Sequence, residues 1–112
     1  MAKSYKEINQ DQRQFGSAYR KASPDTMNAF FLHKAAMVEG AVSIKHKELI
    51  ATGIAIAARC DGCIGAHAAA LKAGATKQEL IETIDVAVLM GGGPAIIYGT
   101  QALAAVEELS AE

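Results

Sequence analysis

A run of ten residues, 49–58, limits the possible folds more than any other feature of the chain, because it is apolar on nearly every side of a helix. A helix that is apolar all round is buried all round. Ser43 supplies a favourable N-cap for this helix. In a chain of 112 residues, the run therefore predicts a helix that lies at the centre of the domain or is shared with a partner.

Alanine occupies 23 of the 112 positions, and no segment alternates between apolar and polar residues as a strand does. Alanine has the highest intrinsic helix propensity. These patterns predict an all-α fold in a single domain that spans residues 1–112, with an N-terminal helix within residues 1–22. The hydrophobic fraction is 51%, and a small domain buries only about two-thirds of its unfolded surface. We therefore expect part of the apolar surface to face other subunits.

Capping and breaking residues divide the chain into about six helices. A capping box at Thr76 and Glu79 starts one of them. Pro24 starts another, which we expect to run to Val38 or Glu39. The expected helices cover residues 5–20, 24–39, 44–58, 61–73, 77–89 and 95–109. Core positions expected on the second of these helices are Met27, Phe30, Phe31 and Met37.

The charge balance argues against nucleic-acid and membrane partners. There are 11 basic and 12 acidic side chains, interleaved along the chain, whereas a nucleic-acid or membrane surface needs clustered Lys and Arg. The polar N-terminus shows no signal peptide, and no apolar run reaches the roughly 20 residues of a membrane helix. We therefore expect a cytoplasmic protein, and in that reducing compartment a cysteine pair is more often catalytic, redox-active or metal-binding than structural.

The two cysteines of the chain, Cys60 and Cys63, form a motif with Glu48 and His67 that reads Glu-x11-Cys-x2-Cys-x3-His. On a helix, the two cysteines and the histidine lie on one face. A helix N-terminus favours the thiolate form of cysteine, which is the reactive form. Histidine is a common proton carrier in enzyme sites, and Glu48 could orient the ring of His67. These are the components of a thiol peroxidase or of a dithiol–disulfide exchanger.

Two other interpretations of the cysteine pair are weaker. A zinc site usually needs four ligands, and only His67, with Glu48 or the distant His33 or His46, could complete one. The cysteines could also be inert core residues. No cofactor motif is recognisable in the chain, and we expect no bound metal.

At this point the chain resembles the carboxymuconolactone decarboxylase superfamily, on its AhpD-like alkylhydroperoxidase branch. The resemblance lies in the four-residue pattern and in the segments 60–67, 73–76 and 91–94. It covers about residues 23–106. Decarboxylase members of the superfamily generally lack the cysteine pair, so the pair favours redox chemistry over decarboxylation.

The resemblance implies a helical protein that assembles into homotrimers or homohexamers, and a hydroperoxide reductase regenerated by an external dithiol. Cys63 would attack the peroxide, Cys60 would close the disulfide, and His67 with Glu48 would relay the proton. The chain departs from the best-characterised AhpD pattern at Gly62, where that pattern has a second histidine. The implied relay is therefore shorter.

The residues themselves give conflicting indications of which cysteine is activated. In thioredoxin-like pairs the first cysteine, nearer the helix terminus, is usually the activated one, whereas the helical spacing of His67 favours Cys63. We therefore expect Cys63 to be the activated cysteine.

Two other functions stay open at this stage. One is a lactone decarboxylase-like or other non-redox enzyme, and the other is an oligomeric scaffold or redox sensor whose disulfide changes assembly.

Overall fold

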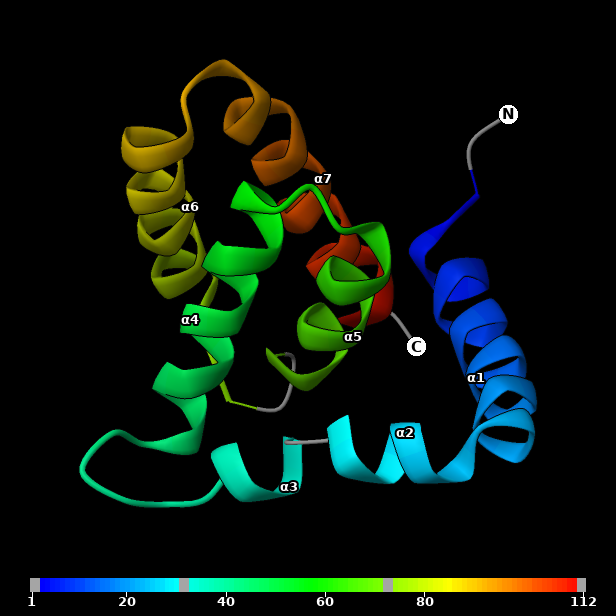
Figure 1. Cartoon of the computed structure of the whole chain (residues 1–112). Coiled ribbons are helices and arrows are strands. Elements are labelled where there is room, and N and C mark those ends of the chain that lie inside the picture. Colours follow the sequence, from blue (N-terminus) through cyan, green and yellow to red (C-terminus); the bar gives the residue numbers. More distant parts are fainter. Residues whose placement is uncertain (1–2, 31–32, 72–73, 111–112) are drawn as a thin grey trace.

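The computed structural model describes residues 3–30, 33–71 and 74–110, and these residues form helices joined by turns, without any strand. The all-α fold class predicted from the sequence is confirmed (Figure 1). The helices of the described residues are α1 (Tyr5–Ala22), α2 (Pro24–Phe30), α3 (His33–Ala36), α4 (Ile44–Ala57), α5 (Asp61–Leu71), α6 (Lys77–Gly91) and α7 (Gly93–Ser110).

The predicted helix starts at Ser43 and Thr76 are both present. The Ser43 hydroxyl accepts the backbone N–H of His46 at 3.2 Å and so caps α4. Thr76 and Glu79 form the reciprocal capping box at the start of α6. Each cap satisfies backbone N–H groups that the first turn of a helix leaves without a partner. Local polar residues therefore set where both helices begin.

Helices α4 to α7 pack into a bundle, and α1 lies against α5 and α7 (Figure 1). The largest side chains at the centre of the bundle include Ile56 of α4, Ile64 of α5 and Leu80 of α6, which are almost fully buried. Helices α6 and α7 come close at Gly99, because a Cβ atom there would lie 2.6 Å from Ile84 Cγ2. Within this bundle, α5 packs against both α4 and α7.

The helix predicted from Pro24 to Val38 or Glu39 is helical over residues 24–30 and 33–36, which form α2 and α3, and residues 31–32 between them lie outside the described residues. The predicted end at Val38 or Glu39 is wrong, because α3 ends at Ala36. Lys47 of α4 provides the physical reason for this end, because its Nζ donates to the carbonyl oxygens of Ala36 at 2.9 Å and Val38 at 2.7 Å. A lysine that satisfies the final carbonyls stabilises a helix terminus there.

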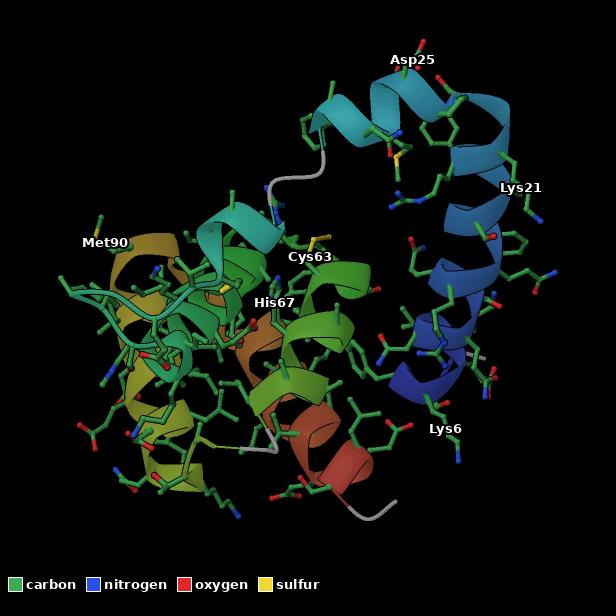
Figure 2. All side chains as sticks on the ribbon, turned by 90° about the horizontal axis from the view of Figure 1, so that it is seen from below. Lys6, Lys21, Asp25, Cys63, His67 and Met90 are labelled. Atoms are coloured by element: carbon green, nitrogen blue, oxygen red, sulfur yellow. A yellow bond between two sulfur atoms is a disulfide. The ribbon has the colours of Figure 1, made fainter. Side chains whose placement is uncertain are left out.

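The expected core position of Phe30 is also wrong, since 79% of this residue is exposed. Among the described residues, α2 packs against no helix except α1, so the far end of the arm formed by α1 and α2 is not covered by the bundle. Figure 2 shows Lys21 and Asp25 at this far end. Met27 and Met37 are half-buried, and Phe31 lies outside the described residues.

Helix α4 is buried on one face only within a single copy of the chain. Its inner face includes Leu49, Ala55 and Ile56, whereas Ile50 is 54% exposed and Ile54 is 64% exposed. Burial on all sides, which its composition predicts, is therefore not reached by one copy alone. The outer faces of α4 and α6 enclose an apolar groove of about 490 Å³, lined among others by Ile50, Ile54, Val86 and Met90.

Within residues 3–30, 33–71 and 74–110, none of the helices combines the length and the apolar character that crossing a bilayer requires.

Candidate redox site

The turn between α4 and α5 fixes the first cysteine. Cys60 N–H donates to the Ala55 carbonyl at 3.1 Å, and Arg59 N–H donates to the Ile56 carbonyl at 3.1 Å. This pair of hydrogen bonds is a Schellman motif, which ends a helix on a residue in the left-handed conformation. Arg59 is that residue, with a φ of 57°, and it is the one described non-glycine residue with positive φ. A strained backbone position thus lies directly before Cys60.

Cys60 is also the N-cap of α5. Its carbonyl oxygen accepts the N–H of Ile64 at 2.9 Å, and its Sγ accepts the N–H of Cys63 at 3.2 Å. A cap side chain that bonds the third residue of a helix is the ordinary N-cap geometry, here made by sulfur. Both sulfurs therefore lie at the positive end of the α5 dipole, where negative charge is favoured.

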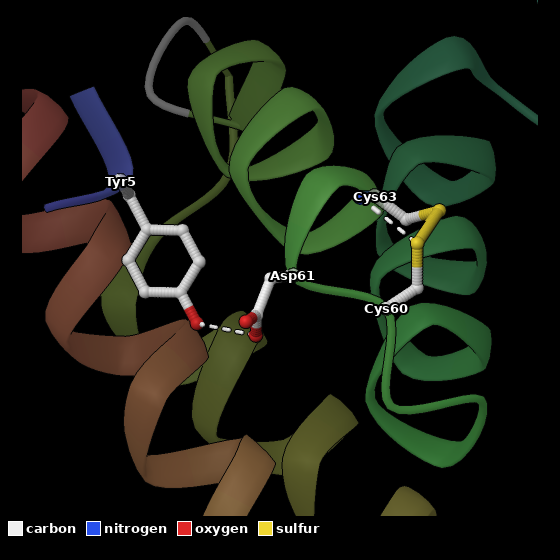
Figure 3. The surroundings of a disulfide bond; sticks show 4 residues. All are labelled: Tyr5, Cys60, Asp61 and Cys63. Atoms are coloured by element: carbon white, nitrogen blue, oxygen red, sulfur yellow. Dashed lines mark hydrogen bonds between the residues drawn. A yellow bond between two sulfur atoms is a disulfide. The ribbon is translucent and has the colours of Figure 1, made fainter. Parts of the chain in front are cut away.

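Cys60 and Cys63 are joined in a disulfide, with their Cα atoms 5.2 Å apart (Figure 3). Cys60 is half-buried and Cys63 is exposed. The pair therefore closes within one turn at the start of α5, and the second cysteine is the one that faces solvent. This arrangement fits a couple that exchanges two electrons with molecules from outside.

The other two residues of the motif are in direct contact. His67 Nδ1 lies 2.6 Å from Glu48 Oε2. The Glu48 carboxylate is almost fully buried, with 8% of its side chain exposed, and the His67 side chain is 22% exposed. Burial of a carboxylate without a partner costs several kcal/mol, so the imidazole is a necessary counterpart. The four residues that the sequence singles out thus come from α4, the following turn and α5, with Cys63 and His67 one turn apart (Figure 2).

The opposite face of α5 carries a second polar cluster, which the sequence did not predict. The single hydroxyl proton of Tyr5 has two acceptors within reach, Gln101 Oε1 at 2.8 Å and Asp61 Oδ1 at 3.5 Å. Asn9 Nδ2 donates to the Gly65 carbonyl at 3.0 Å. Tyr5 lies 56 residues from Asp61, and no local pattern marks two residues so far apart as neighbours.

Burial, together with the nearby Asp61 carboxylate, raises the pKa of Tyr5 to about 12. Both causes favour the neutral phenol over the phenolate. The Tyr5 hydroxyl is therefore a hydrogen-bond donor across the whole physiological pH range. It faces a cavity of about 690 Å³, which Asp61 and Gln101 also line.

Glycine at position 62 gives α1 room to approach α5. A Cβ atom on Gly62 would lie 3.4 Å from Gln12 Cγ, and one on Gly65 would lie 2.4 Å from Asn9 Oδ1. A histidine at position 62 would have to share this space with Gln12. The departure from the AhpD pattern thus coincides with a close contact between two helices.

Within the part of the chain that the structure describes, no three His, Cys, Asp or Glu side chains converge in a way that could hold a metal ion. His46, a candidate fourth zinc ligand, lies 2.6 Å through its Nδ1 from Ser43 Oγ, at the start of α4. The side chain of His33 lies outside the described residues. The disulfide that joins both sulfurs is compatible with a redox pair.

Comparisons with known proteins agree with this architecture. A family model described as "Carboxymuconolactone decarboxylase family" matches residues 24–108. The crystal structure of the apo form of a carboxymuconolactone decarboxylase family protein from Legionella pneumophila superposes with a TM-score of 0.90. The two chains are 44% identical, and the match covers 95% of this chain and 96% of the other.

Two relatives are similar in sequence. An uncharacterized protein of Cupriavidus necator is 41% identical over 107 residues, which cover 94% of this chain and 91% of the relative. A protein of Paracoccus denitrificans, named as uncharacterized protein 4 in the cox locus, is 35% identical over 79 residues, which cover 70% of this chain and 71% of the relative. On the family match and these identities, the chain belongs to the carboxymuconolactone decarboxylase family.

Proposed function

We propose that this protein is a thiol-dependent hydroperoxide reductase of the AhpD-like branch of its family, in which Cys63 attacks the peroxide and Cys60 resolves the product. The observation that carries the proposal is the buried His67–Glu48 pair, at 2.6 Å, one turn from a cysteine pair that already forms a disulfide. An acid–base pair beside a two-electron couple is what peroxide reduction by thiols requires. A disulfide alone would need no such pair.

Exposure favours Cys63 as the attacking residue. Cys63 is exposed and Cys60 is half-buried, and a peroxide has to reach the attacking sulfur. The backbone N–H of Cys63 points at Cys60 Sγ, which keeps the resolving sulfur within bonding distance. The N-terminal position on α5 stabilises a thiolate at either sulfur, so solvent access is what separates their roles.

The His67–Glu48 contact supports a proton relay. Glu48 Oε2 contacts Nδ1 of the ring, and the imidazole would take the proton from the thiol. The buried carboxylate would hold the ring in place and stabilise its cation, as the third member of a nucleophile–base–orienter system does. The spacing of His67 one turn after Cys63 presents both to the same side of α5.

The proposed cycle balances in atoms and electrons. His67 takes the proton of the Cys63 thiol, and the thiolate attacks the O–O bond of the hydroperoxide. Cys63 becomes a sulfenic acid, and the leaving alkoxide departs as an alcohol with the proton that His67 returns. The Cys60 thiol then displaces water from the sulfenic acid and forms the disulfide. An external dithiol supplies two electrons and two protons, becomes a disulfide itself, and restores both thiols. A reducing compartment such as the cytoplasm would favour this regeneration of the two thiols.

Replacement of the attacking sulfur tests the proposal. We expect Cys63→Ser to abolish peroxide-dependent turnover, measured as peroxide-dependent oxidation of a small dithiol. Cys60→Ser should instead accumulate a sulfenic acid or a mixed disulfide on Cys63, detectable by mass spectrometry. Unchanged turnover in Cys63→Ser would overturn the assignment. Full activity after alkylation of both thiols would point to a non-redox enzyme of the same family.

We also propose that the chain assembles into a homotrimer or homohexamer. Several large apolar side chains are exposed around the groove between α4 and α6, and monomers rarely expose contiguous apolar patches of this kind. A second copy of the chain would complete the burial that α4 lacks on its own. The exposed residues of this surface are Ile50, Ile54, Val86, Leu89 and Met90. Light scattering that gave a monomer at micromolar concentration would contradict this assembly.

A further inference from the structure

We propose that Tyr5 is a positioning residue for the redox pair, because its hydroxyl holds the Asp61 carboxylate on the side of α5 that faces away from the disulfide. The inference rests on the proposed redox role of Cys60 and Cys63. It assigns a role to α1, which supplies none of the four residues of the sequence motif. Its basis is the cluster formed by Tyr5, Asp61 and Gln101.

The position of Asp61 makes its orientation important. Asp61 follows the N-cap Cys60 directly and is the first residue of α5. A carboxylate next to a forming thiolate opposes the negative charge on sulfur, and the opposition grows as the two groups approach. Figure 3 shows the Asp61 side chain directed at Tyr5, whereas the disulfide lies on the other side of the chain at this point. The carboxylate is thus turned away from the sulfurs.

Tyr5 is well anchored for this purpose. It is 8% exposed, and its hydroxyl lies 2.8 Å from Gln101 Oε1 as well as 3.5 Å from Asp61 Oδ1. Its backbone N–H donates to Glu108 Oε2 at 3.3 Å, which fixes the start of α1 to α7. Asp61 itself is exposed and borders the 690 Å³ cavity. Without the hydroxyl, its side chain would have room to turn toward the sulfurs.

Other charged groups near the start of α5 also influence how readily a thiolate forms there. Among the described residues, Arg59 lies directly before α5, and Lys3 and Asp11, the latter on α1, line the same cavity as Asp61. His67 of α5 contacts Glu48 of α4, and Glu108 and Tyr98 of α7 act on Tyr5. Lys3 and Asp11 form an ion pair and contribute little net charge. Glu48 is engaged by His67. Asp61 is therefore the carboxylate next to the sulfurs whose orientation depends on Tyr5.

The test is a double-mutant cycle of Tyr5→Phe and Asp61→Asn, with Tyr19→Phe on the exposed side of α1 as the matched control. The first measurement is the equilibrium between the protein disulfide and dithiothreitol, in which two electrons and two protons pass from the reagent to the protein. The second is the pH profile of thiol alkylation in the reduced protein. Neither measurement involves a peroxide, so the inference can fail or hold independently of peroxidase activity.

We expect Tyr5→Phe to shift the equilibrium toward the protein disulfide by about threefold, because the released carboxylate disfavours the thiolate. The midpoint of the alkylation profile should move to higher pH. Asp61→Asn should change both measurements by less than about twofold, because Tyr5 already holds the carboxylate away from the sulfurs, and adding Tyr5→Phe to Asp61→Asn should change nothing further. Tyr19→Phe should match the wild type.

An equal effect of Tyr5→Phe with and without the Asp61 carboxylate would overturn the inference, since it would show a purely structural role for the tyrosine. No effect of Tyr5→Phe would overturn it as well. Circular dichroism would verify that each variant is folded. Should Tyr5→Phe fail to fold, Asp61→Asn alone decides: an equilibrium within about twofold of the wild type supports a carboxylate that is held away from the sulfurs, and a shift of about threefold or more toward the dithiol refutes it.

Discussion

The two long faces of α5 differ in the side chains that they present and in what those side chains contact. One face carries the disulfide and His67, and it meets the buried Glu48 of α4. The other carries Gly62 and Gly65 and meets α1 at close range. The first face is built around a polar contact beside exposed sulfur, and the second around small residues that admit a neighbouring helix. One helix of 11 residues thus combines chemistry and packing by giving each its own side.

One carboxylate lies beside each face, and the two carboxylates are held in position differently. Glu48 is buried and contacts an imidazole at 2.6 Å, so it is held in one position. Asp61 is exposed and is bonded to Tyr5 at 3.5 Å, so a single contact directs it. The comparison indicates that burial fixes the Glu48 carboxylate at the face of α5 that carries the disulfide and His67, which we call the chemical face. The Asp61 carboxylate depends on α1, which packs against the face that carries Gly62 and Gly65, and we call this the packing face.

The largest effect is expected on the rate of thiol oxidation, for a substitution at the chemical face. Glu48→Gln should lower the rate of peroxide-dependent thiol oxidation by about 100-fold, because the His67 ring loses the carboxylate that orients it and stabilises its cation. The rate is measured in single turnover by stopped-flow spectroscopy. Glu82→Gln, at an exposed position of α6, is the control and should keep the wild-type rate. A wild-type rate in Glu48→Gln would remove the carboxylate from the proposed relay.

A smaller effect is expected when the packing face is overfilled. Gly65→Val should lower the free energy of unfolding by about 2 kcal/mol, because a Cβ atom there already lies 2.4 Å from Asn9 Oδ1 and 3.3 Å from Tyr5 Cδ1. Urea denaturation measures the change. Gly16→Val is the matched control, since nothing lies within 4 Å of a Cβ atom at Gly16, and should alter stability by no more than about 0.5 kcal/mol. Equal effects at both glycines would show that α1 does not pack on α5 as described.

The smallest expected effect concerns stability at alkaline pH. The pKa of Tyr5 in the folded chain is raised to about 12 from its ordinary value of 10.0. The folded state therefore holds this proton more tightly, and its contribution to stability is complete below pH 10 and is lost as the pH rises toward 12. Subtracting the Tyr5→Phe curve from the wild-type curve isolates this loss from the titration of lysines. A difference that stays constant from pH 9 to 12 would contradict the burial of the phenol.

The sequence predicted best the features that depend on neighbouring residues. The capping box of Thr76 and Glu79 and the cap at Ser43 are local arrangements, and both are confirmed. The cysteine pair was recognisable because its members lie within one helical turn. The contact between Glu48 and His67 joins residues 19 apart, and it could be predicted because both residues belong to the motif.

The features that were missed depend on tertiary structure. Nothing in the sequence around Tyr5 indicates that its hydroxyl meets Asp61 and Gln101, because that contact depends on how α1 packs against two other helices. Phe30 was placed in the core because it is large and apolar, but α2 extends beyond the bundle. Helix periodicity gives the face of a residue and leaves open whether another helix covers that face.

The junction at Arg59 has a mechanical consequence. Cys60 closes the cap of α4 and opens α5 at the same time, so the backbone there has no spare length to absorb movement. We therefore expect that the breaking and remaking of the sulfur–sulfur bond in the proposed cycle proceeds by rotation about side-chain bonds, with little change in the backbone. A cycle of this kind needs little reorganisation of the polypeptide between its oxidised and reduced halves.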